Sequence, residues 1–216
     1  MDRRGEEKSR EMMLDELLGY DRVTIQCHDN PDADAIASGF GLYCFFRDQG
    51  KDVRFLYSGK NRVRKANLTL MVEKLGIPLK YLAHPGEEPV DGLLITVDCQ
   101  FGAGNVTKIW ASEIAVIDHH PLEVICTEKM LLQPNLGSCA TLVWTMLQEM
   151  HYPVEKNKDL GTALYYGLFM DTNQFSELSN PVDMDMRESL NFDKNLISLF
   201  RNSNISLKEL EIAGVA

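Results

Sequence analysis

Three short apolar runs in this chain are each followed at once by side chains that can bind a metal ion. The runs lie at residues 23–26, 93–97 and 114–117. Their apolar, largely β-branched composition is typical of buried strands. Parallel strands need long crossover connections, usually helices, and helical segments do separate the first two of these runs. The pattern therefore predicts an α/β fold built around a buried, mostly parallel sheet.

The segments between the runs complete this prediction. Residues 35–48 are apolar nearly all round, so we expect a buried helix, and 53–57 would then close a right-handed β-α-β unit. We expect a short amphipathic helix at about 10–19, an edge strand at 81–82, and a further strand at 124–132 that is antiparallel or at an edge. The predicted architecture is a three-layer, Rossmann-like sheet flanked by helices on both faces.

The polar residues that follow the runs should meet in space. His28, Asp32 and Asp34 follow the first run and Asp98 follows the second. The third run is followed by Asp118-His119-His120. Because the carboxyl ends of parallel strands open on one crevice, we expect these side chains at one site. Taken alone, the acids of the first turn are equally well explained as helix N-terminal caps.

Asp171 adds a further carboxylate, at the end of a predicted helix over 158–170. The helix dipole disfavours a negative charge there, so a cation should hold it. Imidazole and carboxylate ligands without thiolate suit Mn²⁺ or Mg²⁺. The carboxylates exceed what one ion needs. We therefore expect two divalent cations, bridged by a carboxylate and a hydroxide, as in enzymes that hydrolyse phosphoryl groups.

A helix start at Gly137-Ser138 offers a second polar feature. Ser138 is a natural N-cap, and the amides of residues 137–139 could hold an anion such as a phosphate. Capping without ligand binding is the alternative reading. A dense basic cluster, Lys60, Arg62, Arg64 and Lys65, is typical of a solvated loop, with phosphate contact as the alternative.

Charge and hydropathy exclude several classes of partner. The net charge of −10 argues against a long nucleic-acid duplex, because such binding depends on phosphate neutralisation. No apolar run approaches the roughly 20 residues of a membrane span, and the charged N-terminus does not resemble a secretory signal. The five cysteines lie mostly in apolar runs, which predicts reduced, buried thiols. We therefore expect a cytoplasmic protein that does not bind membranes.

Four motifs in order resemble the DHH phosphoesterase superfamily, which takes its name from the Asp118-His119-His120 triplet. They are residues 28–34, Val97-Asp98, the triplet itself, and Asp171-Thr172 after a helix. The Gly137-Ser138 element is also similar to the family's glycine-serine helix start. The chain looks most like the RecJ-like branch of oligoribonucleases and 3′-phosphoadenosine-5′-phosphate phosphatases, over residues 20–175.

The resemblance implies a role for each candidate residue. His28 and Asp32 would hold the first ion and Asp98 would bridge. Asp34, His119 and Asp171 would complete the second ion. His120 would face the substrate phosphate as hydrogen-bond donor or acid, and Asp118 would orient a histidine from behind. The resulting site prediction has catalytic residues His120, Asp98 and Asp118, metal ligands His28, Asp32, Asp34, Asp98, His119 and Asp171, and phosphate-binding residues Gly137, Ser138 and His120.

The resemblance also predicts the domain organisation. Residues 1–180 would form the catalytic domain, and 181–216 a helical extension and linker toward a C-terminal substrate-binding domain whose glycine-rich motif is absent here. The polar stretch after Glu177, with its acids Asp183, Asp185, Glu188 and Asp193, reads as solvated. Apolar residues near the C-terminus, such as Leu199, Phe200, Leu207 and Leu210, would be left uncovered without that domain, so self-association to a homodimer is a hypothesis. The family also commonly has glycine near Asn173 and Ala33.

These observations predict a Mn²⁺-dependent phosphohydrolase that acts by in-line attack of a metal-bridging hydroxide. Its substrates would be small nucleotides: short oligoribonucleotides, a 3′,5′-bisphosphate nucleotide or dinucleotides. One alternative is an inorganic pyrophosphatase or polyphosphatase, which should have more basic residues around its crevice. Another is a non-catalytic nucleotide-binding regulatory module.

Overall fold

A computed structural model describes residues 13–86 and 90–203 of the chain. Six strands form one sheet in the order β3-β2-β1-β4-β5-β6, and every neighbouring pair is parallel. The order reverses between β1 and β4, and ligands of α/β proteins bind at such a reversal. The strands are β1 (Arg22–Gln26), β2 (Asp52–Tyr57), β3 (Leu79–Tyr81), β4 (Val90–Val97), β5 (Ala111–Asp118) and β6 (Met130–Leu132).

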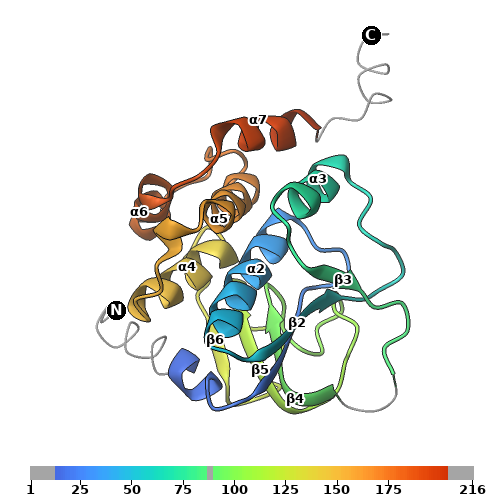
Figure 1. Ribbon diagram of the computed structural model, residues 1–216. Coiled ribbons are helices and arrows are strands. Elements are labelled where there is room, and N and C mark those ends of the chain that lie inside the picture. Colours follow the sequence, from blue (N-terminus) through green and yellow to red (C-terminus); the bar gives the residue numbers. More distant parts are fainter. Residues whose placement is uncertain (1–12, 87–89, 204–216) are drawn as a thin grey trace.

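One face of the sheet is covered by helices (Figure 1). Alternate strand residues such as Ile25, Ile95 and Ile117 point to this side and join the main apolar core. Gly39 allows α2 to approach the sheet closely, because a side chain there would collide with the ring of Phe55. The largest helices of this layer are α2 (Ala33–Asp48), α4 (Cys139–Glu149) and α5 (Lys158–Asp171).

The opposite face is covered by loops. Leu94 and Val116 pack there against Phe101 and Ile109 of the connection between β4 and β5. A right-handed crossover from β4 to β5 must pass on this side. The connection contains Gly102 and Gly104 and lacks a helical apolar period, and none of its residues is helical. The predicted three-layer α/β fold is thus confirmed, with a second layer of loops where helices were expected.

The remaining elements extend the helical side. A helix at 13–17 lies within the predicted segment 10–19, whose first residues are outside the described part of the chain. The strand predicted at 124–132 is only β6, three residues long and parallel at the edge. The other helical elements are α3 (Ala66–Lys74), the short 3-10 helix η1 (Val154–Lys156), α6 (Pro181–Ser189) and α7 (Lys194–Ser203).

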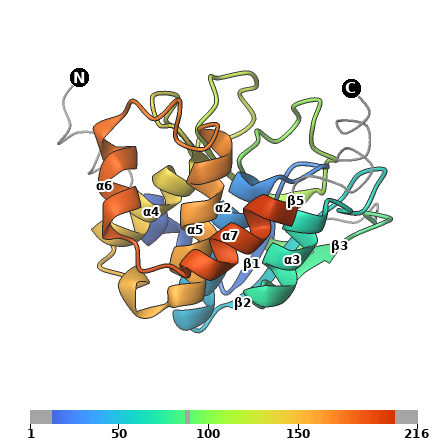
Figure 2. The same cartoon turned by 90° about the horizontal axis from the view of Figure 1, so that it is seen from above.

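Helices α6 and α7 share the core of the preceding residues. Met186 and Phe200 are fully buried, and the ring of Phe200 lies 5.2 Å from that of Tyr166. Helix α7 lies beside α3 (Figure 2). Residues 181–203 therefore pack as part of the same body, although the domain division predicted at residue 180 stays a prediction. The predicted linker at 206–215 lies outside the described residues.

Truncating Phe200 tests this packing. We expect Phe200→Ala to lower the free energy of unfolding by about 3 kcal/mol or more, because large-to-small changes of buried aromatic residues cost that much. Leu199→Ala on the same helix is the matched control, since Leu199 is 39% exposed and should cost under about 1 kcal/mol. Urea unfolding followed by circular dichroism measures both. Equal, small effects would mean that α7 is not part of the core.

The cysteines are mostly buried, as their apolar neighbours in the sequence predicted. All five cysteines are free, and all except Cys126 are buried. Among the residues that the structure describes, no helix has the length and apolar character needed to cross a membrane.

Candidate metal centre

The turn after β1 delivers two of the predicted ligands. His28 follows the strand, and Asp32 is the N-cap of α2. One oxygen of Asp32 accepts hydrogen bonds from the amides of Asp34 and Ala35, each at 3.0 Å. Its other oxygen lies 3.9 Å from Nε2 of His28. Asp32 can therefore cap the helix with one oxygen and bind an ion with the other, so the two readings of this turn are compatible.

The predicted ligands form two groups of three. In the first, the ligand atoms of His28, Asp32 and Asp98 lie within 4.8 Å of one another. In the second, those of Asp34, His119 and Asp171 do. These are the two sets that the family resemblance implies. Asp171 stands at the end of α5, as predicted, and its Oδ2 is 3.3 Å from Nε2 of His119.

Asp98 lies between the two groups. Its Oδ2 is 3.8 Å from Nε2 of His28, and its Oδ1 is 3.5 Å from Nε2 of His119. His120 Nδ1 is also 3.7 Å from this Oδ1, and these two residues with His119 make a third possible ligand group. One carboxylate thus faces both ligand sets with different oxygens. This is the arrangement that a bridging ligand needs.

The environment of Asp98 is unfavourable for a carboxylate, and a bound cation would compensate for this. It is 3% exposed, and its Oδ1 has no hydrogen-bond partner among the described residues. Its φ of 58° is left-handed, a strained conformation for a non-glycine residue that clusters at functional sites. Burial raises the pKa of Asp98, and the neighbouring carboxylates Asp34 and Asp32 raise it further. The donor set therefore fits divalent cations with oxygen and imidazole ligands.

Asp34 is fixed by the start of α4. The amide of Cys139 donates to its Oδ2 at 2.7 Å, and the amide of Ala140 donates to its Oδ1 at 2.8 Å. Burial, with Asp171 nearby, raises the pKa of Asp34, while these two amides lower it. The positive end of the α4 dipole thus holds a carboxylate of the protein itself. The start of α4 therefore orients Asp34, which is a predicted metal ligand.

Gly137 and Ser138, which are predicted to bind a phosphate, make hydrogen bonds within the protein. The amide of Gly137 donates to Oδ2 of Asp183 at 2.9 Å. Ser138 is the N-cap as predicted, but its hydroxyl is buried and accepts from the amide of Thr141 at 3.0 Å. These groups are already engaged within the protein. A phosphate would have to displace a carboxylate to reach the Gly137 amide.

Asp183 also corrects the reading of the polar tail. It was predicted to be solvated, but α6 places it fully buried against the start of α4. Burial raises the pKa of Asp183, and hydrogen bonds from Thr141 and Gly137 partly offset this. Its burial depends on how α6 docks, which the local sequence pattern does not show.

Both histidines of the triplet are oriented from behind. Nδ1 of His119 lies 3.2 Å from the carbonyl oxygen of Leu136, and donation there leaves Nε2 for an ion. Nδ1 of His120 is 2.8 Å from Oδ1 of Asp118, the contact predicted for Asp118. This hydrogen bond raises the pKa of His120. The side chain of His120 is 51% exposed, so its other nitrogen can meet a substrate.

Gln100 is a site residue that the sequence did not reveal. It is buried, and its Nε2 donates to Oδ2 of Asp118 at 3.1 Å and to the carbonyl of Pro121 at 2.8 Å. Its Oε1 accepts from the amides of Glu123 and Val124. One side chain thus fixes both Asp118 and the loop after the triplet. A single glutamine in a loop carries no pattern that marks it.

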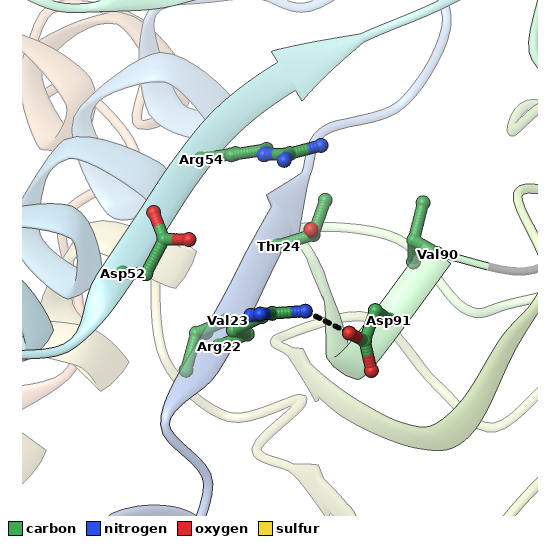
Figure 3. A pocket seen from close by; sticks show the side chains of 7 residues that line it. All are labelled: Arg22, Val23, Thr24, Asp52, Arg54, Val90 and Asp91. Atoms are coloured by element: carbon green, nitrogen blue, oxygen red, sulfur yellow. Dashed lines mark hydrogen bonds and ion pairs between the residues drawn. The ribbon is translucent and has the colours of Figure 1, made fainter.

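A cavity opens directly beside the ligands. It has a volume of about 230 Å³ and is lined by Asp32, Ala33, Asp34, Lys65, Asn67, Leu68, Met170 and Asp171. Another cavity of about 50 Å³ lies at the start of β1, β2 and β4, at the opposite end of the strands (Figure 3). Arg22 and Asp91 form an ion pair there. The larger cavity, at the carboxyl ends, is the one placed to receive a substrate.

Known proteins include relatives of this chain. An uncharacterized protein of Methanocaldococcus jannaschii is 26% identical over 197 residues, which cover 90% of this chain and 40% of that protein. A probable manganese-dependent inorganic pyrophosphatase of Streptococcus thermophilus is 28% identical over 155 residues, which cover 70% of this chain and 48% of that protein. The chain thus spans about half or less of these relatives.

The fold is shared with a solved protein. The crystal structure of an exopolyphosphatase-related protein from Bacteroides fragilis matches with a TM-score of 0.74 and 18% identity, over 96% of this chain and 64% of that one. At this identity the match shows the fold alone. The model of the DHH family N-terminal domain matches residues 22–168, well over half of the chain. The chain therefore belongs to the DHH family of phosphoesterases, as its Asp118-His119-His120 triplet predicted.

Proposed function

We propose that this chain is the catalytic part of a Mn²⁺-dependent phosphohydrolase that cleaves phosphoester bonds of small nucleotides. The observation that carries the proposal is Asp98, whose two oxygens face two separate ligand groups. Two divalent cations, one in each group, would neutralise the crowded carboxylates. When bound, such ions lower the pKa of a water and stabilise charge on the transferred phosphoryl group. Mn²⁺ fits the imidazole and carboxylate ligands, with Mg²⁺ as the alternative.

The protein's own residues would position the reaction. Asp34 and His119 are held by the α4 amides and by the Leu136 carbonyl, so their ligand atoms point at the site without reorganisation. His120 would donate a hydrogen bond to the leaving oxygen or a non-bridging oxygen of the phosphate, because Asp118 fixes its ring and favours its protonated form. Asp118 would act through His120 rather than touch the substrate.

Gln100 would position His120 through Asp118. We expect Gln100→Ala to lower kcat about tenfold with little change in the Mn²⁺ concentration needed for half-maximal rate, because the Gln100 side chain hydrogen-bonds Asp118 and the loop after the triplet rather than a predicted metal ligand. The loss of its hydrogen bonds should also lower the free energy of unfolding by about 1–3 kcal/mol. Gln148→Ala, at an exposed position, is the control. An unchanged kcat in a destabilised Gln100→Ala protein would leave Gln100 a purely structural role.

Small nucleotides suit the cavity better than inorganic polyphosphate. A polyphosphate crevice needs several cationic side chains, and Lys65 is the only residue of the basic cluster Lys60–Lys65 among those lining the cavity. Arg62 stacks on the ring of Tyr81 instead, 5.0 Å from its centroid. Because one relative is named a probable manganese-dependent inorganic pyrophosphatase, hydrolysis of pyrophosphate is the second candidate activity. The chain's acidity disfavours a long duplex as partner.

Activity with a panel of substrates tests the proposal. Purified protein with Mn²⁺ should hydrolyse bis-p-nitrophenyl phosphate, a short oligoribonucleotide and a 3′,5′-bisphosphate nucleotide faster than pyrophosphate. A preference for pyrophosphate would instead assign the second candidate. If the protein binds nucleotide but hydrolyses none of these, it is a regulatory module. Light scattering on the same sample tests the proposed homodimer, which a clean monomer would exclude.

A further inference from the structure

The cavity beside the metal ligands has a side that the proposed chemistry does not use. Asp32, Asp34 and Asp171 line one part of it, and Lys65, Asn67, Leu68 and Met170 line the rest. Its volume of about 230 Å³ lies far above the roughly 30 Å³ that one water takes up in the liquid. There is room for an organic group as well as a phosphate. The first residues of α3, with Lys65 and Met170, thus form a wall of the same cavity that the predicted ligands line.

Asn67 lines this cavity and carries an unsatisfied acceptor. The residue is 2% exposed, and its Nδ2 donates to the hydroxyl of Tyr166 at 3.0 Å. Its Oδ1 is buried and has no partner among the described residues. Buried polar atoms in native proteins nearly always have a partner, so an exception calls for an explanation. A ligand in the cavity that donates a hydrogen bond would supply the partner.

The other residues of this wall are apolar or cationic. Leu68 is buried, and Met170 lies at the end of α5, just before Asp171. Lys65 precedes α3, and no ion pair within the described part of the chain involves its ammonium group. One wall thus combines a hydrogen-bond acceptor, an apolar surface and an unpaired positive charge.

We propose that this cavity binds the sugar of a nucleotide substrate, with a ribose hydroxyl donating to Oδ1 of Asn67. The carbon face of the sugar packs on Leu68 and Met170, and Lys65 pairs with a phosphate of the same nucleotide. This assignment rests on the proposed function and narrows its substrate class to hydroxyl-bearing nucleotides. Inorganic pyrophosphate does not fit this wall, because fully ionised phosphate oxygens only accept hydrogen bonds and gain nothing from apolar contacts.

Ligands that differ only in their hydroxyls test the proposal without any mutation. Adenosine 5′-monophosphate and its 2′,3′-dideoxy analogue share the base and the phosphate. In the presence of Mn²⁺, isothermal titration calorimetry on the full chain should show about tenfold tighter binding of the hydroxyl-bearing nucleotide, since a site built to hydrogen-bond a group rejects an analogue without it. Equal affinity of the two nucleotides would overturn the proposal.

Two variants then separate the role of Asn67 Oδ1 as an acceptor from the hydrogen bond between Asn67 and Tyr166. Asn67→Ala removes both the acceptor and the bond to Tyr166, whereas Tyr166→Phe removes the same bond and leaves the amide. We expect Asn67→Ala to lose the preference between the two nucleotides and Tyr166→Phe to keep it. Pyrophosphate affinity should be the same in both variants as in the parent protein. A parallel loss of preference in both variants would mean that the hydrogen bond merely shapes α3, and would also overturn the proposal.

The outcomes distinguish this proposal from the proposed function. If the parent protein hydrolyses phosphodiesters but binds the two nucleotides equally, the function stands and the sugar site fails. If it hydrolyses no substrate of the panel but shows the hydroxyl preference, and Asn67→Ala abolishes it, the sugar site stands and the catalytic function fails.

Discussion

Asparagine in place of Asp98 is expected to slow phosphodiester hydrolysis with Mn²⁺ about a thousandfold. The amide has one oxygen where the carboxylate has two, so it cannot face His28 and His119 with an acceptor each. Metal ions supply several kcal/mol of transition-state stabilisation, and each 1.4 kcal/mol is a factor of ten in rate. Asparagine also tolerates the left-handed backbone at this position, where φ is 58°. The lower hydrolysis rate would therefore reflect the changed metal ligand rather than a changed fold.

Initial rates at saturating Mn²⁺ measure this effect. Asp185→Asn makes the same chemical change at an exposed position of α6 and should keep the parent rate. A rate for Asp98→Asn within tenfold of the parent would mean that Asp98 does not bridge. The activity, if any, would then have to come from one ligand group alone.

The grouping of the predicted ligands could be expected from the sequence because most of them directly follow a recognisable segment. His28, Asp98 and the triplet come at the ends of apolar strands, and parallel strands bring their carboxyl ends together regardless of distance in sequence. Asp171 could be found because a carboxylate at a helix C-terminus is electrostatically out of place. In each case a local pattern and one topological rule were sufficient.

Residues whose role depends on distant docking were missed. Asp183 reads as one of several acids in a polar stretch, and only the packing of α6 on α4 buries it. The amides of the α4 start were expected to hold a phosphate. They hold Asp34 instead, from more than 100 residues away in the sequence. The sequence indicates that these amides can accept a negative group, but it cannot choose between a bound ligand and a carboxylate of the chain.

The loops on the second face of the sheet also could not be predicted from the sequence. Helices were expected on both faces of the sheet, because most parallel connections contain a helix. Residues 99–110 instead form a loop that buries Phe101 and Ile109 and carries Gln100 to Asp118. An irregular connection has no period that predicts its contacts, so the positioning residue in it could not be recognised.

Saturating Mn²⁺ is expected to raise the melting temperature of the protein by about 10 °C or more. A ligand at a hundred times its Kd stabilises the folded state by about 2.7 kcal/mol per site, so two sites give about 5 kcal/mol. A domain of about 200 residues gains roughly 2–4 °C for each kcal/mol. Differential scanning fluorimetry with Mn²⁺ and with EDTA measures the shift. A shift below about 2 °C at millimolar Mn²⁺ would contradict the two-ion site.

Asp98→Asn provides a stricter test. It should raise the melting temperature without metal but reduce the increase that Mn²⁺ causes. Without metal, the variant is expected to melt at a higher temperature than the parent, since it removes a buried charge that lies among carboxylates and has an unpartnered oxygen. With Mn²⁺, it should gain only a small part of the parent's shift. Asp185→Asn should follow the parent in both conditions. If Asp98→Asn instead lowered the melting temperature without metal, the Asp98 carboxylate would stabilise the fold. Its left-handed backbone would then not indicate a metal site.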